Sequence, residues 1–225
     1  MPRIVRRSLF ALFIFSEGFY DLASPLVIED FGSRIATVWS ELRPATRGLV
    51  ERALQAASGG PQPTRNFQYD ARADLELSKL LKVLDDRVAE KSDSLDADTV
   101  GKVKSVADTC AAVLLEKTES AEVFAQLVRR AEKQRDYKRI DVLADALNVR
   151  FPPSEICELA RSEDVIVREL ANEALARCPI SVLAQLLSDP VDSEVARAAL
   201  RRQVVEYGSE EARQIVNVLD QGEGM

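Results

Sequence analysis

The stretches ELANEAL at residues 169–175 and EVARAAL at residues 194–200 decide the fold, because both predict a helix with nearly the same pattern of acidic, small and aliphatic residues. We call these stretches phrases. DVLADAL at residues 141–147 follows the same template. Each phrase begins with an acidic residue, ends in Ala-Leu, and places small or aliphatic residues between them at helical spacing. Alanine at these positions allows neighbouring helices to approach closely. The three phrases therefore predict helices that recur along the chain and pack against one another.

A shorter apolar stretch precedes each phrase: EVFAQLVRRA, SEICELARS and ISVLAQLLS. Prolines at 152, 153, 179 and 190 separate the stretches, and proline is disfavoured inside a helix. Two short helices cannot bury their apolar faces alone, so each pair must stack on the next pair. The C-terminal half is therefore expected to consist of stacked helical hairpins.

This pattern resembles the HEAT and armadillo class of α-solenoid repeats. AQLLSDPVDSEVARAAL at residues 184–200 has the family's order of helix, Asp-Pro turn and second helix. CELARSEDVIVRELANEAL at residues 157–175 is similar, with Val167 and Arg168 where the family often has Val-Arg. The resemblance covers roughly the last hundred residues. It implies an all-α fold of helical-hairpin repeats, stacked as a short HEAT/armadillo-like solenoid with an N-terminal helical cap. An irregular helical bundle is the alternative.

The composition also favours helices. Aromatic residues make up 6% of the 225-residue chain, and only nine glycines and nine prolines interrupt it. No stretch alternates apolar and polar residues for long enough to predict a strand. We expect four regions: a helical segment over residues 1–60, which caps the repeats or forms a separate unit, a linker over 61–73, the repeat domain over 74–221, and a flexible tail over 222–225.

Local signals refine the expected helices. A helical pattern runs from Asp30 to residue 57, and Pro44 should end one helix and begin another. The next pattern starts at Asp74, and Asp96 or Asp98 should cap the helix that follows it. A closing helix is expected to begin at Ser209.

The residue types absent from the chain restrict its chemistry. The sequence contains no histidine, which excludes Ser-His-Asp and Cys-His nucleophilic sites and zinc sites that use imidazole. Cys110, Cys157 and Cys178 form no Cys-x-x-Cys pair and are predicted to be small buried residues in a reducing compartment. Glycine-rich phosphate loops are absent as well. We therefore predict no catalytic residue, no cofactor and no metal site.

The N-terminus carries Arg3, Arg6 and Arg7, followed by an apolar run that begins at Leu9 and ends at Phe15. The run is too short to span a bilayer. Three interpretations remain: a core helix, which we favour, an interfacial membrane anchor, or a poor secretory signal.

One cluster of charge stands out from the acidic chain, whose formal net charge is −7. RRAEKQRDYKR at residues 129–139 places six cations against two acids. Stacking could align it with arginines of later helices, Arg168 among them, into a basic ridge for an acidic peptide or a nucleic-acid backbone. A solvated face paired with neighbouring carboxylates is the alternative. The candidate partner-binding residues are Arg129, Arg130, Lys133, Arg135, Tyr137, Lys138, Arg139 and Arg168.

These observations favour a non-catalytic, cytoplasmic scaffold or adaptor that binds another protein through an acidic or amphipathic segment. A HEAT-like protein that binds nucleic acid is the first alternative, disfavoured by the net negative charge. A peripheral membrane adaptor that uses the run from Leu9 to Phe15 is the second.

Overall fold

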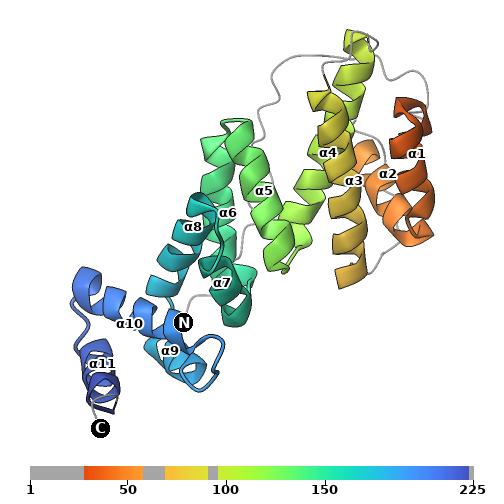
Figure 1. Cartoon of the computed structure of the whole chain (residues 1–225). Helices are drawn as coiled ribbons and strands as arrows, with labels where there is room; N and C mark the ends of the chain where they lie inside the picture. The colour runs from red at the N-terminus through yellow and green to blue at the C-terminus, as the bar shows by residue number, and fades with distance from the viewer. Residues whose placement is uncertain (1–27, 58–68, 91–95, 223–225) are drawn as a thin grey trace, which may run out of the picture.

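The computed structural model describes residues 28–57, 69–90 and 96–222, and all regular structure in these ranges is helical (Figure 1). The all-α prediction is confirmed there. The short 3-10 helix η1 precedes the α-helices. The bounds are η1 Ile28–Phe31, α1 Ser33–Glu41, α2 Pro44–Ala57, α3 Ala71–Ala89, α4 Ala97–Lys117, α5 Ala121–Lys133, α6 Tyr137–Arg150, α7 Pro153–Ala160, α8 Val165–Ala176, α9 Ile180–Leu186, α10 Ser193–Tyr207 and α11 Glu210–Gly222.

The first four α-helices are built around the long hairpin of α3 and α4. Helix α1 packs on α3, and α2 packs on α4. Pro44 stands at the first residue of α2, where its missing N–H leaves no helical hydrogen bond unmade, as predicted. The hairpin core is formed by fully buried apolar residues at helical spacing: Leu77, Leu80, Leu81, Leu84, Val103, Val106, Ala107, Cys110 and Leu114.

Helix α3 begins at Ala71, three residues before the predicted start at Asp74. The reason is Asp70, whose carboxylate accepts a hydrogen bond from the backbone N–H of Ala73 at 2.8 Å. The end of the predicted linker therefore belongs to the helix. Asp96 caps α4 in the same way, accepting from Thr99 N at 2.8 Å, which confirms that prediction.

From α5 onward, most contacts join helices that are one or two places apart in the chain. Helix α5 packs on α6 and α7, α6 packs on α8, and α8 packs on α10. Helix α11 follows α10, and Ser209 Oγ accepts from Ala212 N at 3.3 Å at its start. Figure 1 shows the chain advancing from α1 at one end of the molecule to α11 at the other.

The recurring phrases lie on the buried faces of α6, α8 and α10. Their final leucines, Leu147, Leu175 and Leu200, are fully buried. Four of the five alanines in the second and third phrases, Ala171, Ala174, Ala196 and Ala199, are buried as well, and Ala198 is exposed. These small side chains allow the close helix packing that the phrases predict.

An aspartate recurs at the start of each of these three helices. Asp136, Asp164 and Asp192 are separated by 164 − 136 = 28 and 192 − 164 = 28 residues. The first two accept backbone N–H hydrogen bonds, at 3.1 Å from Arg139 N and at 3.0 Å from Ile166 N. Asp192 instead accepts from Arg161 Nη1 at 2.8 Å. The three helices α6, α8 and α10 therefore begin at intervals of equal length in the chain, each at an aspartate.

Other predictions fall partly on these ranges. Cys110 and Cys157 are buried and Cys178 is half-buried, and all three are free thiols. No helix of the described residues is long and apolar enough to cross a membrane. The arginines and the apolar run that precede Ile28 lie outside the described residues, as do most of the predicted linker and the last three residues.

Candidate partner-binding site

The connection between α5 and α6 is a tight turn with a defined hydrogen-bond pattern. Asp136 N donates to Ala131 O, and Arg135 N donates to Glu132 O, both at 2.9 Å. This pair of bonds is the Schellman arrangement, which closes a helix on a residue in the left-handed conformation. The residue in that position is Arg135, with φ 55°.

Arg135 occupies a backbone conformation that usually belongs to glycine or asparagine. Within the described ranges no other non-glycine residue has a positive φ. The sequence therefore retains a large cationic side chain at a position where it costs conformational energy. Backbone strain of this kind is concentrated at functional sites, so the conformation of Arg135 makes this turn a candidate binding site.

The side chains of this turn are exposed and mostly uncompensated. Lys133, Arg135 and Lys138 make no ion pair with any described residue, and the Tyr137 side chain between them is 67% exposed. Lys138 also lies in the first turn of α6, which contains no acidic residue, so its charge opposes the helix dipole. We call Lys133, Arg135, Tyr137 and Lys138 the basic turn.

Three other predicted residues, Arg129, Arg139 and Arg168, have partners within the fold. Arg129 Nε lies 3.4 Å from Asp164, and Arg139 Nε lies 3.4 Å from Asp136. Arg168 Nη1 donates to Ser162 O at 2.9 Å. The Arg129 side chain is still 52% exposed, whereas Arg139 and Arg168 contact residues close to them in the chain, at the starts of α6 and α8.

Arg130 is not part of an exposed basic ridge, contrary to the prediction. Arg130 is only 6% exposed, because it lies on the face of α5 that packs on the α3–α4 hairpin. Nε contacts both carboxylate oxygens of Asp85, at 3.0 and 2.9 Å, and Nη2 contacts Asp108 Oδ1 at 2.7 Å. Burial raises the pKa of Asp85 more than the charge of Arg130 lowers it. Arg130 is therefore a core residue that a partner cannot reach.

Later arginines do not extend the basic turn along the molecule. Arg201 contacts Asp220 at 2.7 Å, and Arg202 contacts Glu173 at 3.0 Å and Glu206 at 2.7 Å. On these helices the alternative interpretation, a face of paired charges, describes the structure better than a continuous ridge. These later arginines are paired, whereas Lys133, Arg135 and Lys138 of the basic turn have no ion pair with a described residue.

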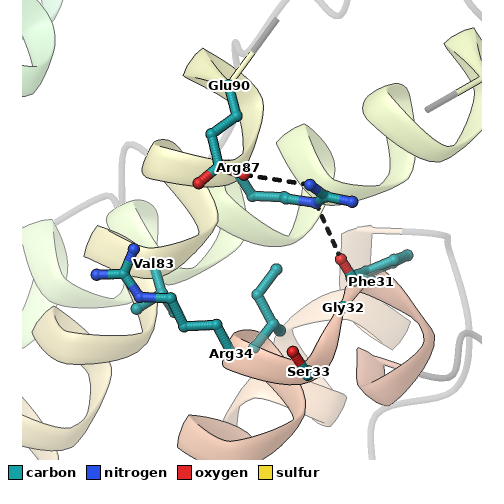
Figure 2. Close-up of a pocket in the computed structure, with 8 residues that line it drawn as sticks. Phe31, Gly32, Ser33, Arg34, Val83, Arg87 and Glu90 are labelled. Carbon is teal, nitrogen blue, oxygen red and sulfur yellow. Dashed lines mark hydrogen bonds and ion pairs between the residues drawn. The ribbon is translucent and has the colours of Figure 1, made fainter. Parts of the chain in front are cut away.

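A hollow of about 350 Å³ lies between the start of α1 and the end of α3 (Figure 2). Two arginines line it, but both have partners. Arg87 donates to Phe31 O at 3.2 Å and contacts Glu90 at 3.1 Å, and Arg34 lies 3.5 Å from Asp86. These contacts attach η1 and α1 to α3, so the hollow is best explained as a structural junction.

A second hollow, of about 420 Å³, is the groove between α3 and α5, which the sequence did not indicate. The two helices run parallel, since Gln126 Nε2 donates to Ser78 O at 3.0 Å and Arg130 reaches Asp85 further along. Leu75 lines the groove and is 67% exposed. Its position outside the apolar stripe of α3 was the available signal.

Nothing in the described ranges forms a metal site, since no group of three His, Cys, Asp or Glu side chains could hold an ion. Comparisons of the chain with protein-family models, with curated proteins and with solved structures found no match.

Proposed function

We propose that this protein is a non-catalytic scaffold whose helical hairpins stack as a short α-solenoid, and whose basic turn binds an acidic or amphipathic segment of a partner protein. The observation that carries the proposal is Arg135, held in a left-handed conformation between two unpaired lysines. A glycine would close the same turn at lower cost, so the guanidinium has a role that stability does not explain.

The contacts between helices support the solenoid part of the proposal. A solenoid requires each unit to touch mainly its neighbours, and the main contacts among α5 to α10 join helices at most three places apart. Ion pairs run in the same direction: Arg129 of one unit reaches Asp164 of the next, and Arg161 reaches Asp192. Solenoids present their turns and faces as extended binding surfaces.

The chemistry of the basic turn supports an acidic partner. Three cations around the exposed ring of Tyr137 match a segment that offers carboxylates next to an aromatic or aliphatic side chain. Each exposed contact contributes little alone, about 0.2–1 kcal/mol, so affinity requires several together. Three free thiols in the described part of the chain favour a reducing, cytoplasmic location.

Nucleic acid is the second candidate, and the same unpaired cations favour it. Three phosphate contacts would give binding that weakens steeply with salt. The net charge of −7 opposes this alternative over the rest of the surface. Salt dependence and nuclease treatment separate the two candidates.

The test is affinity capture from native lysate with and without nuclease. The variant is Lys133→Glu with Lys138→Glu, which reverses two exposed charges and leaves Arg130 in the core. The matched control is Lys104→Glu with Lys117→Glu, which changes the net charge equally on the exposed side of α4.

The scaffold proposal expects protein partners that survive nuclease, are retained by the control and are lost by the variant. Capture that disappears with nuclease would assign the turn to nucleic acid. An identical set of partners on variant and control would mean that the basic turn is not the binding surface.

A further inference from the structure

The groove between α3 and α5 has opposite charges at its two ends. Glu122 is exposed at the end where both helices begin, and Lys79 and Lys82 line the other end. Leu75 and Val123 form the apolar floor between them. Asp74 and Lys82 are eight residues apart on α3, which corresponds to about 12 Å along the helix axis. The groove therefore suits an occupant with an apolar centre and a cation and a carboxylate at opposite ends.

The polypeptide enters the described structure near the C-terminal end of α3, on the face of α3 that packs on η1 and α1. Ile28 opens η1, and Phe31 O accepts a hydrogen bond from Arg87 Nε at 3.2 Å. Arg87 lies five residues beyond Lys82 on α3, or about 7.5 Å along the axis. Lys79 also contacts Glu41 of α1 at 2.5 Å, so the helix face toward α1 adjoins the groove. A segment that precedes Ile28 would pass around α3, beside Lys79, to reach the lysine end of the groove.

The sequence before Ile28 carries charges in the complementary order. Counting back from Ile28, Asp21 and Glu17 come first, the apolar run from Phe15 to Leu9 follows, and Arg7, Arg6 and Arg3 come last. Arg7 and Glu17 are ten residues apart, which would span about 15 Å in a helix. This is close to the distance between the two charged ends of the groove. Seven consecutive apolar residues also require cover, since each large side chain gains about 1.5–3 kcal/mol on burial.

We propose that the N-terminal segment of this chain, residues 3–21, is the occupant of the α3–α5 groove. Its carboxylates face Lys79 and Lys82, apolar side chains from the run cover Leu75, and its arginines face Glu122. This assignment does not depend on the basic turn or on any partner. It gives the favoured interpretation of the N-terminus, a core helix, a specific binding surface.

Disulfide trapping in the full-length chain tests the proposal. The test variant carries Phe13→Cys with Leu75→Cys, and the control carries Phe13→Cys with Val205→Cys, which introduces a thiol on α10 at a position at least as exposed as Leu75. Both carry Cys178→Ser to remove the half-buried native thiol. Under mild oxidation we expect an intramolecular cross-link in the test variant at least about tenfold faster than in the control, because docking raises the local concentration. The rate should not depend on protein concentration.

A charge exchange supplies a second measurement. Lys82→Glu should slow the trapping about threefold, the effect of one exposed ion pair, and adding Glu17→Lys should restore it. Equal rates in test and control, cross-links between two molecules, or no restoration by Glu17→Lys would overturn the proposal. Slow trapping together with co-sedimentation on phosphatidylserine vesicles would assign the segment to a membrane surface instead.

Discussion

One guanidinium, that of Arg130, contacts the carboxylates of both Asp85 and Asp108, and so joins α5 to both helices of the α3–α4 hairpin. The Nε–Oδ2 distance to Asp85 is 2.9 Å, and the Nη2–Oδ1 distance to Asp108 is 2.7 Å. The two aspartates are partly exposed, whereas the arginine side chain is 5% exposed. Removing the cation leaves two carboxylates close together with no neutralising charge.

We therefore expect Arg130→Met to lower the free energy of unfolding by about 3 kcal/mol, measured by urea denaturation. Lys133→Met, one turn away on the exposed side, is the control and should change it by less than about 0.5 kcal/mol. Adding Asp85→Asn and Asp108→Asn to Arg130→Met should recover part of the loss. No recovery would mean that lost packing, not unpaired charge, causes the effect.

Arg135→Gly should stabilise the protein by about 0.5–1 kcal/mol. Relief of the left-handed conformation gives about 1–2 kcal/mol, and the greater freedom of glycine in the unfolded chain offsets part of it. Arg135→Ala is the control, because it removes the same charge and keeps the strain. Thermal and urea unfolding of the two variants measure the difference. Equal stabilities would show that the turn tolerates the conformation without cost.

The same two variants separate stability from binding. If Arg135 is kept for a partner, both should weaken capture of that partner to a similar extent, although only the glycine variant gains stability. If Arg135→Gly captures the partner as well as the native chain does, partner binding does not explain why arginine occupies this strained position.

The three thiols should react at very different rates in the native protein. Burial raises the pKa of Cys110 and of Cys157 to about 12, and it raises the pKa of Cys178 as well. Cys178 is only half-buried, so a reagent can reach it. Mass spectrometry after brief alkylation at pH 8 should find the label on Cys178 and very little on the other two. Full unfolding should make all three equally reactive, and rapid native labelling of Cys110 would contradict its placement in the core.

Acid should weaken the attachment of α2 to α3. A hydrogen bond from Arg43 and one from Ala73 N lower the pKa of Asp70 below its unfolded value of about 3.9. The stabilisation from Asp70 is therefore complete above about pH 4 and is lost as the pH falls toward its folded pKa. The unfolding free energy should fall more steeply between about pH 4 and pH 2 in the native chain than in Arg43→Met. Parallel pH profiles would exclude this contact as a source of acid sensitivity.

Much of the packing of α6, α8 and α10 could be predicted from the sequence, because the spacing of apolar residues that ends in Leu147, Leu175 and Leu200 indicates a buried helix face. Arg130 was misplaced although its position held a signal. It lies seven residues after Val123 and three after Leu127, and so on the buried face of α5. Its partners Asp85 and Asp108 are distant in the chain, and only the tertiary fold brings them together. The left-handed backbone of Arg135 left no trace in sequence, because no glycine or asparagine marks the turn.

The equal spacing of Asp136, Asp164 and Asp192 bears on how the length of this protein can change. Arg129 and Arg161 each bridge to the aspartate that opens the second helix of the next hairpin. Removal of residues 137–164, which are 28 residues, would move Asp192 to the chain position of Asp164, the aspartate that Arg129 now contacts. Under the proposed solenoid, a shorter form of this chain that lacks one hairpin would therefore keep an aspartate in place for Arg129.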